Sequence, residues 1–199
     1  LSARNEGKRK YLWPMMSLSP SSGLTGEQGL RKSMEDAHVQ IDSILCVPKC
    51  FPSGLWCIFD GHGGHEVAEL AETVFPRRFQ EDLKEALKRA HNKLDDIDMK
   101  ALLKNCFWET DAELVETLGD VALTTGCTVA VIVLLGDMLY VANAGDSEAT
   151  LIRVGIDGNA EGKEITKKHK PRDESEKKRI EALGGMVFGG RVFGKLAVC

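Results

Sequence analysis

Apolar positions in the first third of the chain change from a strand-like pattern to a helical one. Residues 37–45 alternate moderately between apolar and polar, and residues 55–59 form a shorter, more apolar run, so each segment is predicted to be a strand. The stripe of an amphipathic helix follows, at Val67, Leu70, Ala71 and Val74. Pro76 is expected to end or kink this helix.

The remaining pattern predicts helices first and then mostly strands. Helical periodicity covers residues 77–91 and 102–118, and a shorter helix is expected between Asp173 and Gly184. Strands and hairpins are predicted at 127–135, 138–144, 149–154 and 187–192. The order of strands, helices and hairpins predicts an α+β fold with antiparallel sheets rather than a regular βαβ alternation.

Serine-rich residues 1–22 show little periodicity and are predicted to be an N-terminal extension or linker. Residues 23–199 are then expected to form one domain with a substantial core, or a large part of a bigger one. The chain begins with Leu1 and stops after an apolar segment. Both ends are therefore expected to be cuts through a longer protein.

Charge and composition exclude several classes of partner. The net charge is −4 with a pI near 5.8, which argues against nucleic acid, and the basic runs Lys8–Lys10 and Lys167–Lys170 are interpreted as solvated faces. No apolar run approaches the roughly 20 residues that span a membrane, and no signal peptide is evident. An intracellular location, cytoplasmic or nuclear, is therefore expected.

The six cysteines do not suggest a disulfide framework. Cys57, Cys106 and Cys127 lie in apolar patterns and are predicted to be core residues. Cys46 and Cys50 lack a second pair at zinc spacing, so no zinc site is predicted there.

Acidic residues stand at the ends of several predicted strands. Glu35 and Asp36 precede the first strand, Asp60 ends the second, and Asp146 follows residues 138–144. If these strands are neighbours in one sheet, the carboxylates meet at one rim, where their mutual repulsion favours a divalent cation such as Mg²⁺ or Mn²⁺. The alternative is that they are unrelated surface carboxylates.

The segment Asp60-Gly61-His62-Gly63-Gly64 combines a carboxylate, an open glycine backbone and an imidazole just before a predicted helix. The Gly61 carbonyl could ligate a cation, and His62 could be a general acid for a leaving alkoxide. Arg31, four residues before Glu35, is suited to a bidentate grip on phosphate. The alternatives are an ordinary strand-to-helix turn, a capping histidine and a surface arginine.

Together these segments resemble the motifs of the metal-dependent protein phosphatases of type 2C. The similar segments occur in the order of that family: Arg31-Lys32-Ser33-Met34-Glu35-Asp36, Phe59-Asp60-Gly61-His62-Gly63-Gly64, Thr125-Gly126-Cys127-Thr128, Asn143-Ala144-Gly145-Asp146-Ser147, His169-Lys170-Pro171, and Gly184-Gly185 with residues 191–198. The resemblance covers residues 25–199 approximately.

The resemblance implies an antiparallel β-sandwich flanked by helices in four α-β-β-α layers. It also implies hydrolysis of phosphoserine and phosphothreonine in protein substrates by a metal-activated water, with two Mg²⁺ or Mn²⁺ ions and a third, weaker one. By the same resemblance, Asp60 bridges two ions, Gly61 adds its carbonyl, and Glu35 and Asp36 hold metal-bound waters. Further roles implied are Asp146 on the acidic rim, Arg31 on the phosphate and His62 as proton donor.

Two departures from the family pattern limit these expectations. Glu148 stands where the family usually has arginine, and it is expected to point outward. The chain also stops before the later acidic motifs, so the domain is expected to be incomplete and this piece weakly active or inactive. Exposed strand edges would then favour dimerisation or poor stability. The rivals are a pseudophosphatase that binds phosphoproteins and, less consistent with the charge, a phosphodiesterase or nuclease.

Overall fold

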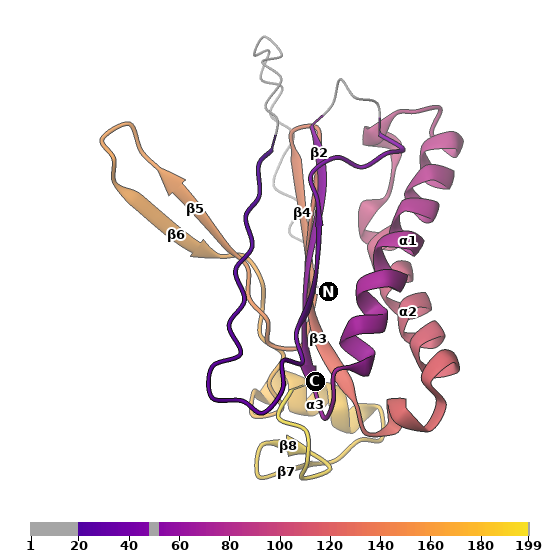
Figure 1. Cartoon of the computed structure of the whole chain (residues 1–199), viewed down its shortest axis with the longest axis vertical. Coiled ribbons are helices and arrows are strands. Elements are labelled where there is room, and N and C mark those ends of the chain that lie inside the picture. The colour runs from indigo at the N-terminus through magenta and orange to yellow at the C-terminus, as the bar shows by residue number, and fades with distance from the viewer. Residues whose placement is uncertain (1–19, 48–51, 199) are drawn as a thin grey trace.

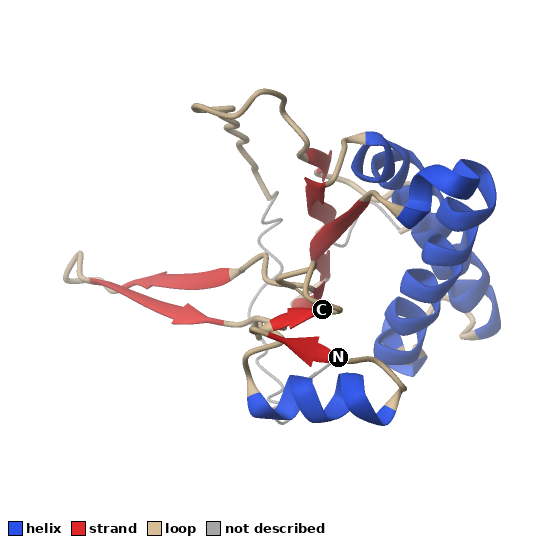
Figure 2. Cartoon of the chain, turned by 90° about the horizontal axis from the view of Figure 1, so that it is seen from below, coloured by secondary structure: helices blue, strands red, loops and turns tan. Residues whose placement is uncertain are grey.

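A computed structural model describes residues 20–47 and 52–198 of the chain. Most of the predicted N-terminal extension, residues 1–19, lies outside these ranges, as do Cys50 and Cys199. The α+β class with antiparallel sheets is confirmed. The described strands form one four-stranded sheet and two two-stranded sheets. Figure 1 shows their arrangement from one side and Figure 2 shows it from below.

The central feature is a four-stranded antiparallel sheet. Its strands lie in sequence order, β1-β2-β3-β4. Their bounds are β1 Ala37–Ile41, β2 Ser53–His62, β3 Gly126–Leu135 and β4 Met138–Ala144. β1 ends earlier than the alternation of residues 37–45 predicts. β2 extends past the predicted end at Phe59 and includes Asp60, Gly61 and His62, because these residues keep pairing with β3.

Two long helices, α1 (Glu66–Arg89) and α2 (Met99–Leu118), cover one face of this sheet (Figure 1). The core lies between them and the sheet, where Phe59 of β2 packs edge-on against Phe75 of α1 at 6.2 Å between ring centroids. Phe75 makes a second edge contact, with Phe107 of α2, at 5.4 Å. The helices and one sheet face therefore share a single hydrophobic core.

Pro76 lies inside α1, so the expectation of two helices divided at this residue is wrong. A proline in a helix interior costs about 3 kcal/mol because it removes one backbone hydrogen bond. Burial on both sides of Pro76 offsets that cost, since the side chains one turn before and after it are part of the core. These buried residues are Ala71, Val74, Phe75, Phe79 and Leu83.

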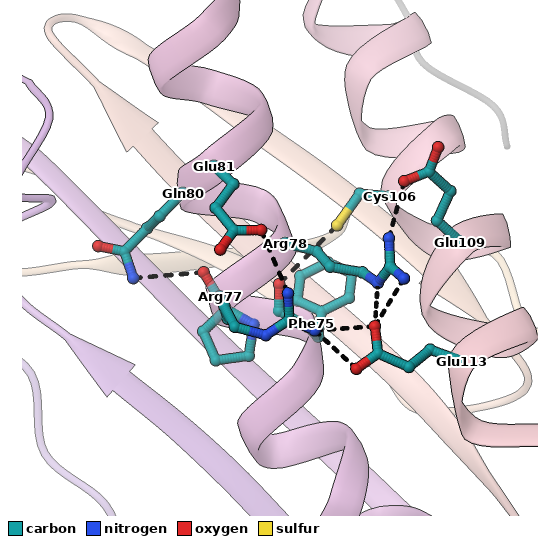
Figure 3. A network of polar contacts seen from close by, with 9 residues as sticks. Phe75, Arg77, Arg78, Gln80, Glu81, Cys106, Glu109 and Glu113 are labelled. Atoms are coloured by element: carbon teal, nitrogen blue, oxygen red, sulfur yellow. Dashed lines mark hydrogen bonds and ion pairs between the residues drawn. The ribbon is translucent and has the colours of Figure 1, made fainter. Parts of the chain in front are cut away.

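A network of ion pairs joins the two helices above the core (Figure 3). Arg77 donates from Nη2 to both carboxylate oxygens of Glu113, at 2.6 and 2.8 Å. Arg78 donates from Nε to Glu113 Oε2 at 2.6 Å and from Nη1 to Glu109 Oε2 at 2.8 Å. Two adjacent arginines of α1 thus fix the register of α2 at two successive turns.

The second half of the chain forms smaller units around this body. Two short 3₁₀ turns, η1 (Leu94–Asp96) and η2 (Gly119–Leu123), flank α2. The others are a ribbon of β5 (Thr150–Val154) and β6 (Ala160–Glu164), helix α3 (Glu174–Ala182), and a hairpin of β7 (Val187–Phe188) and β8 (Arg191–Val192). The ribbon projects away from the sheet in both views (Figures 1 and 2).

Local signals explain most of these units and miss one. Gly184, with φ +84°, ends α3, and the Gly185 amide donates to the Ile180 carbonyl at 2.9 Å, as predicted for a glycine stop. Asp173 precedes α3, but its side chain makes no capping hydrogen bond. Strand β6 was not predicted, because its sequence Ala-Glu-Gly-Lys-Glu is polar and fully exposed.

Candidate functional site

The register of the sheet brings the predicted acidic residues to one end of it. Asp60 pairs with Thr128 across β2 and β3, and His62 pairs with Gly126. On the β1 side, Ala37 pairs with Phe59, so Asp36 comes next to Asp60. We call Glu35, Asp36, Asp60 and Asp146 at this end of the sheet the acidic rim.

Asp146 reaches the rim through the last residues of β4. Ala144 pairs with Val129 of β3, and the next residue, Gly145, packs against Thr128, the partner of Asp60. Gly145 has φ +94°, and a Cβ there would lie 2.7 Å from the Thr128 side chain. Only glycine therefore fits this turn, and the turn sets the position of Asp146.

Alternation along β2 decides which way the site residues point. Leu55, Cys57 and Phe59 are buried under the helices, whereas Ile58 and Asp60 lie on the opposite, more open face. Since side chains alternate along a strand, His62 follows Asp60 onto that face. His62, the predicted proton donor, and Asp60, the predicted bridging carboxylate, thus lie on the same face of the sheet.

The pKa of Asp60 is shifted in the direction expected where several carboxylates lie close together. Partial burial raises the pKa of Asp60, and the charges of Asp36 and Asp146 raise it further. His62 and Arg31 act in the opposite direction and lower the pKa of Asp60. Asp60 therefore interacts with each of these four groups, and the excess of carboxylates over cationic groups around it suits a cation.

Gly61 allows the chain before β1 to approach β2 closely. A Cβ on Gly61 would lie 2.1 Å from the backbone oxygen of Glu35. The Glu35 side chain accepts a hydrogen bond from Ser33 Oγ at 3.2 Å and is half-buried. Glycine at position 61 is thus needed to bring Glu35 to the rim beside Asp60.

Arg31 lies in the exposed loop before the rim. Its backbone amide donates to the Gln28 carbonyl at 3.3 Å, and Gln28 Nε2 donates to the Arg31 carbonyl at 2.8 Å. Its guanidinium makes no hydrogen bond to a rim carboxylate among the described contacts. An arginine held by its backbone with an available head group can bind an anion.

The lysines of residues 167–170 make ion pairs near the acidic rim that the sequence did not predict. Lys170 Nζ forms an ion pair with Asp146 Oδ2. Glu148 is exposed, and Lys168 Nζ pairs with it at 2.8 Å. The basic run reads as a solvated face by composition alone, and only the turn that places it beside residues 146–148 gives it another role.

The donor set at the rim consists of hard oxygens, the type that Mg²⁺ and Mn²⁺ prefer. Asp60, Asp36, Asp146 and the Gly61 carbonyl are the groups that could hold such an ion. Among the residues that the structure describes, no three His, Cys, Asp or Glu side chains are grouped tightly enough to form a metal site by themselves.

The cysteines predicted to be core residues are outside this chemistry. Cys57 and Cys106 are buried, and Cys127 is half-buried against the core. Burial raises the pKa of the Cys106 and Cys127 thiols to about 12 each. These thiols therefore stay protonated and pack as small apolar groups.

Among the described residues, no helix is long and apolar enough to cross a membrane.

Comparison with known proteins gives one consistent result. The family model described as Protein phosphatase 2C matches residues 21–199. A Paramecium tetraurelia protein described as probable protein phosphatase 2C 6 is 41% identical over 187 residues, covering 87% of this chain and 56% of its own length. The Schizosaccharomyces pombe protein phosphatase 2C homolog 3 is 37% identical over 183 residues, covering 88% of this chain and 39% of its own length.

Solved structures show the same fold. The serine-threonine phosphatase 2C from Toxoplasma gondii superposes with a TM-score of 0.62 at 24% identity, over 79% of this chain and 52% of that one. A sex determining protein of C. elegans superposes with a TM-score of 0.64 at 25% identity, over 84% and 40%. The chain therefore spans about half the length of the proteins that it matches.

Proposed function

The chain belongs to the protein phosphatase 2C family, and we propose that it contributes the acidic rim and the phosphate-binding arginine of a metal-dependent protein serine/threonine phosphatase. Phosphoserine and phosphothreonine side chains of proteins are the proposed substrates. Residues 23–199 are proposed as the phosphatase domain portion, preceded by a separate extension.

The observation that carries the proposal is the sheet register. Asp60 lies near the end of β2, Asp36 precedes β1 and Asp146 follows β4, and the pairing of these strands puts the three residues at one end of one sheet. Partial burial and the charges of Asp36 and Asp146 raise the pKa of Asp60, and a bound cation would relieve the repulsion between the carboxylates. A site for cations is the simplest reason for such an arrangement.

Each rim residue has a proposed role. Asp60 and the Gly61 carbonyl would hold the cations directly, Glu35 and Asp36 would hold waters bound to them, and Asp146 would serve an additional, weaker ion. Mg²⁺ or Mn²⁺ bound there would neutralise phosphoryl charge and lower the pKa of a coordinated water.

Arg31 and His62 act on the substrate itself. The Arg31 guanidinium binds two phosphate oxygens and orients the phosphoryl group. His62, on the same sheet face as Asp60, donates a proton to the departing serine or threonine oxygen. That oxygen then leaves as a neutral hydroxyl instead of a charged alkoxide, which makes it a better leaving group.

The proposal is tested by measuring hydrolysis of a phosphothreonine peptide in the presence of Mn²⁺, with the protein in its longest natural form. Asp60→Asn should abolish turnover and weaken Mn²⁺ binding while the melting temperature stays close to wild type. Asp120→Asn, an exposed residue outside the rim, should change neither. Unchanged hydrolysis in Asp60→Asn would refute the assigned site.

A second candidate is a pseudophosphatase that binds phosphoproteins without turnover. It is favoured by the ion pair of Lys170 with Asp146, which already neutralises one carboxylate of the acidic rim. For the 199-residue chain alone we accordingly propose weak cation binding and little turnover. Phosphopeptide binding by calorimetry without release of phosphate, in the longest form and with saturating Mn²⁺, would support the second candidate over the first.

A further inference from the structure

Lys170 occupies the position beside Asp146 where a cation is proposed to bind. Its ammonium group forms an ion pair with Asp146 Oδ2, and the two side chains are 38% and 23% exposed. A carboxylate in the rim is thus already neutralised by a positive charge that belongs to the chain itself.

The backbone around Lys170 is fixed to the turn that carries Asp146. The His169 amide donates to the Gly145 carbonyl at 2.9 Å, and the Gly145 amide donates back to His169 Nδ1 at 3.2 Å. Asn143 Nδ2 donates to the Lys167 carbonyl at 2.7 Å. The two segments therefore run side by side from 143 to 146 and from 167 to 170.

A buried residue and a turn hold the other side of Lys170. Pro171 is fully buried, and the Lys170 carbonyl accepts a hydrogen bond from the Asp173 amide at 2.9 Å. With its neighbours anchored in this way, the ammonium needs to order only its own side chain to reach Asp146. The pair is built into the fold and is not a chance surface contact.

We propose that Lys170 is an internal counter-ion of Asp146 that a divalent cation must displace, so that Lys170 sets the cation concentration at which this part of the rim fills. This inference rests on the proposed cation site. A partly exposed ion pair is weak enough for a doubly charged ion to replace it. Until that exchange, the ammonium relieves the repulsion between Asp146 and Asp60.

The adjacent pair Lys168–Glu148 provides a matched control. Its side chains are 47% and 39% exposed, and it lies in the same two segments. Lys168→Met and Lys170→Met each remove one positive charge and keep a long unbranched side chain. The loss of one positive charge from the protein should affect Mn²⁺ binding equally in the two variants. Only Lys170→Met also removes the ion pair of Asp146.

The test is calorimetric titration with Mn²⁺ of the 199-residue chain and its variants, each first checked for its melting temperature. Lys170→Met should tighten Mn²⁺ binding by about two- to fivefold, the worth of an exposed ion pair. Lys168→Met should change it by less than that. In an Asp146→Asn background, Lys170→Met should have no effect. Lys170→Gln serves as a second variant if Lys170→Met does not fold.

The outcomes separate this inference from the proposed function. Equal effects of the two lysine variants, weaker binding in Lys170→Met, or an effect that persists in the Asp146→Asn background would overturn the counter-ion. Mn²⁺ binding seen only in Lys170→Met supports it. An absence of Mn²⁺ binding in every variant of the 199-residue chain overturns the counter-ion in this chain, and the Asp60→Asn hydrolysis test in the longest natural form decides the cation site separately.

Discussion

A Cβ atom on Gly126 would lie 2.7 Å from Nε2 of His62, so the imidazole ring rests directly against the backbone of β3. The two residues are partners in the β2–β3 register. Gly126 has no positive φ, so its backbone conformation is open to any residue. What the glycine supplies is room for the ring.

Gly126→Ala is expected to displace the His62 ring while the strand survives. The clashing atoms belong to the end of a side chain, which can move, so stability should change by less than about 0.5 kcal/mol. If His62 is the proton donor, kcat should fall by about 10- to 100-fold, the effect of a misplaced catalytic group. Urea unfolding and phosphopeptide kinetics in the longest natural form measure the two effects.

Gly162→Ala is the matched control for this prediction, since a Cβ at Gly162 of β6 would make only ordinary contact, at 3.6 Å. It should leave both stability and kcat near wild type. A Gly126→Ala enzyme with normal kcat would show that the position of the His62 ring is unimportant.

Gly61→Ala should behave differently, because its Cβ would meet a backbone atom, 2.1 Å from the Glu35 oxygen. The Glu35 oxygen belongs to the backbone just before β1, which cannot move far without disturbing the pairing of β1 with β2, so we expect a loss of about 2–3 kcal/mol in the free energy of unfolding, within the range for overpacking. Chemical denaturation measures it. A loss below about 0.5 kcal/mol would mean that the segment before β1 is loosely attached.

Asp82 of α1 is predicted to make the protein less stable as the pH rises. Its Oδ2 is buried and has no hydrogen-bond partner among residues 20–47 and 52–198. Partial burial raises the pKa of Asp82 above its ordinary value of 3.8, Glu109 and Glu81 raise it further, and Arg78 and Arg89 lower it. Because the folded state favours the protonated form, its contribution is present below the ordinary pKa and lost as the pH rises through the raised one.

Asp82→Asn should therefore stabilise the protein at pH 7, by less than about 1 kcal/mol because solvent screens the side chain. The gain should disappear below about pH 4, where Asp82 is protonated in both states. Urea unfolding from pH 3 to 8 measures it, with Glu116→Gln on the exposed side of α2 as control. A stabilisation that is the same at all pH values would exclude this titration as the cause.

Arg78→Ala should weaken the packing of α1 against α2, because Arg78 donates hydrogen bonds to both Glu109 and Glu113. Arg78 and Glu113 are each 25% exposed, so a loss of about 1–2 kcal/mol is expected from these charge-assisted bonds and from the lost packing of the stem. Lys88→Ala, which breaks the exposed pair with Glu85 on the same helix, should cost much less. Equal losses would mean that the network is a surface feature.

The open face of the sheet should cause the 199-residue chain to self-associate. Ile58 is 44% exposed and Leu139 is 43% exposed there, and β1 and β4 are its edge strands. Replacing both by threonine, which keeps strand propensity, should shift the chain toward monomer in light scattering. Val115→Thr on α2, at a residue 52% exposed, is the control. A monomeric wild-type chain at all concentrations would refute the prediction.

The sequence predicted the central sheet well because its strands follow simple patterns. Residues 127–135 and 138–144 form β3 and β4 nearly as expected, since an apolar run, a Gly-Asp turn and a return strand are local signals. The convergence of Asp60 and Asp146 was also foreseeable, as a consequence of strand ends in one sheet. The roles assigned to these residues stay predictions.

What could not be predicted depends on contacts between distant segments. Pro76 interrupts a helical pattern locally, and only the core on both sides of it keeps α1 continuous. The pairing of Lys170 with Asp146 joins residues that are 24 positions apart, through a turn with no strong pattern of its own. β6 has neither apolar alternation nor burial, so its pairing with β5 leaves no trace in composition.

The pairing of β2 with β3 also acts as a check on the folding of the site. A slip of one residue would turn Phe59 outward and carry the charge of Asp60 into the hydrophobic core under α1 and α2, where burial of an unpaired charge is costly. Such a species could not persist as a stable but inactive protein. The register that stabilises the core is thus also the register that puts the carboxylates on the correct face. A chain that folds stably therefore has its site residues correctly placed.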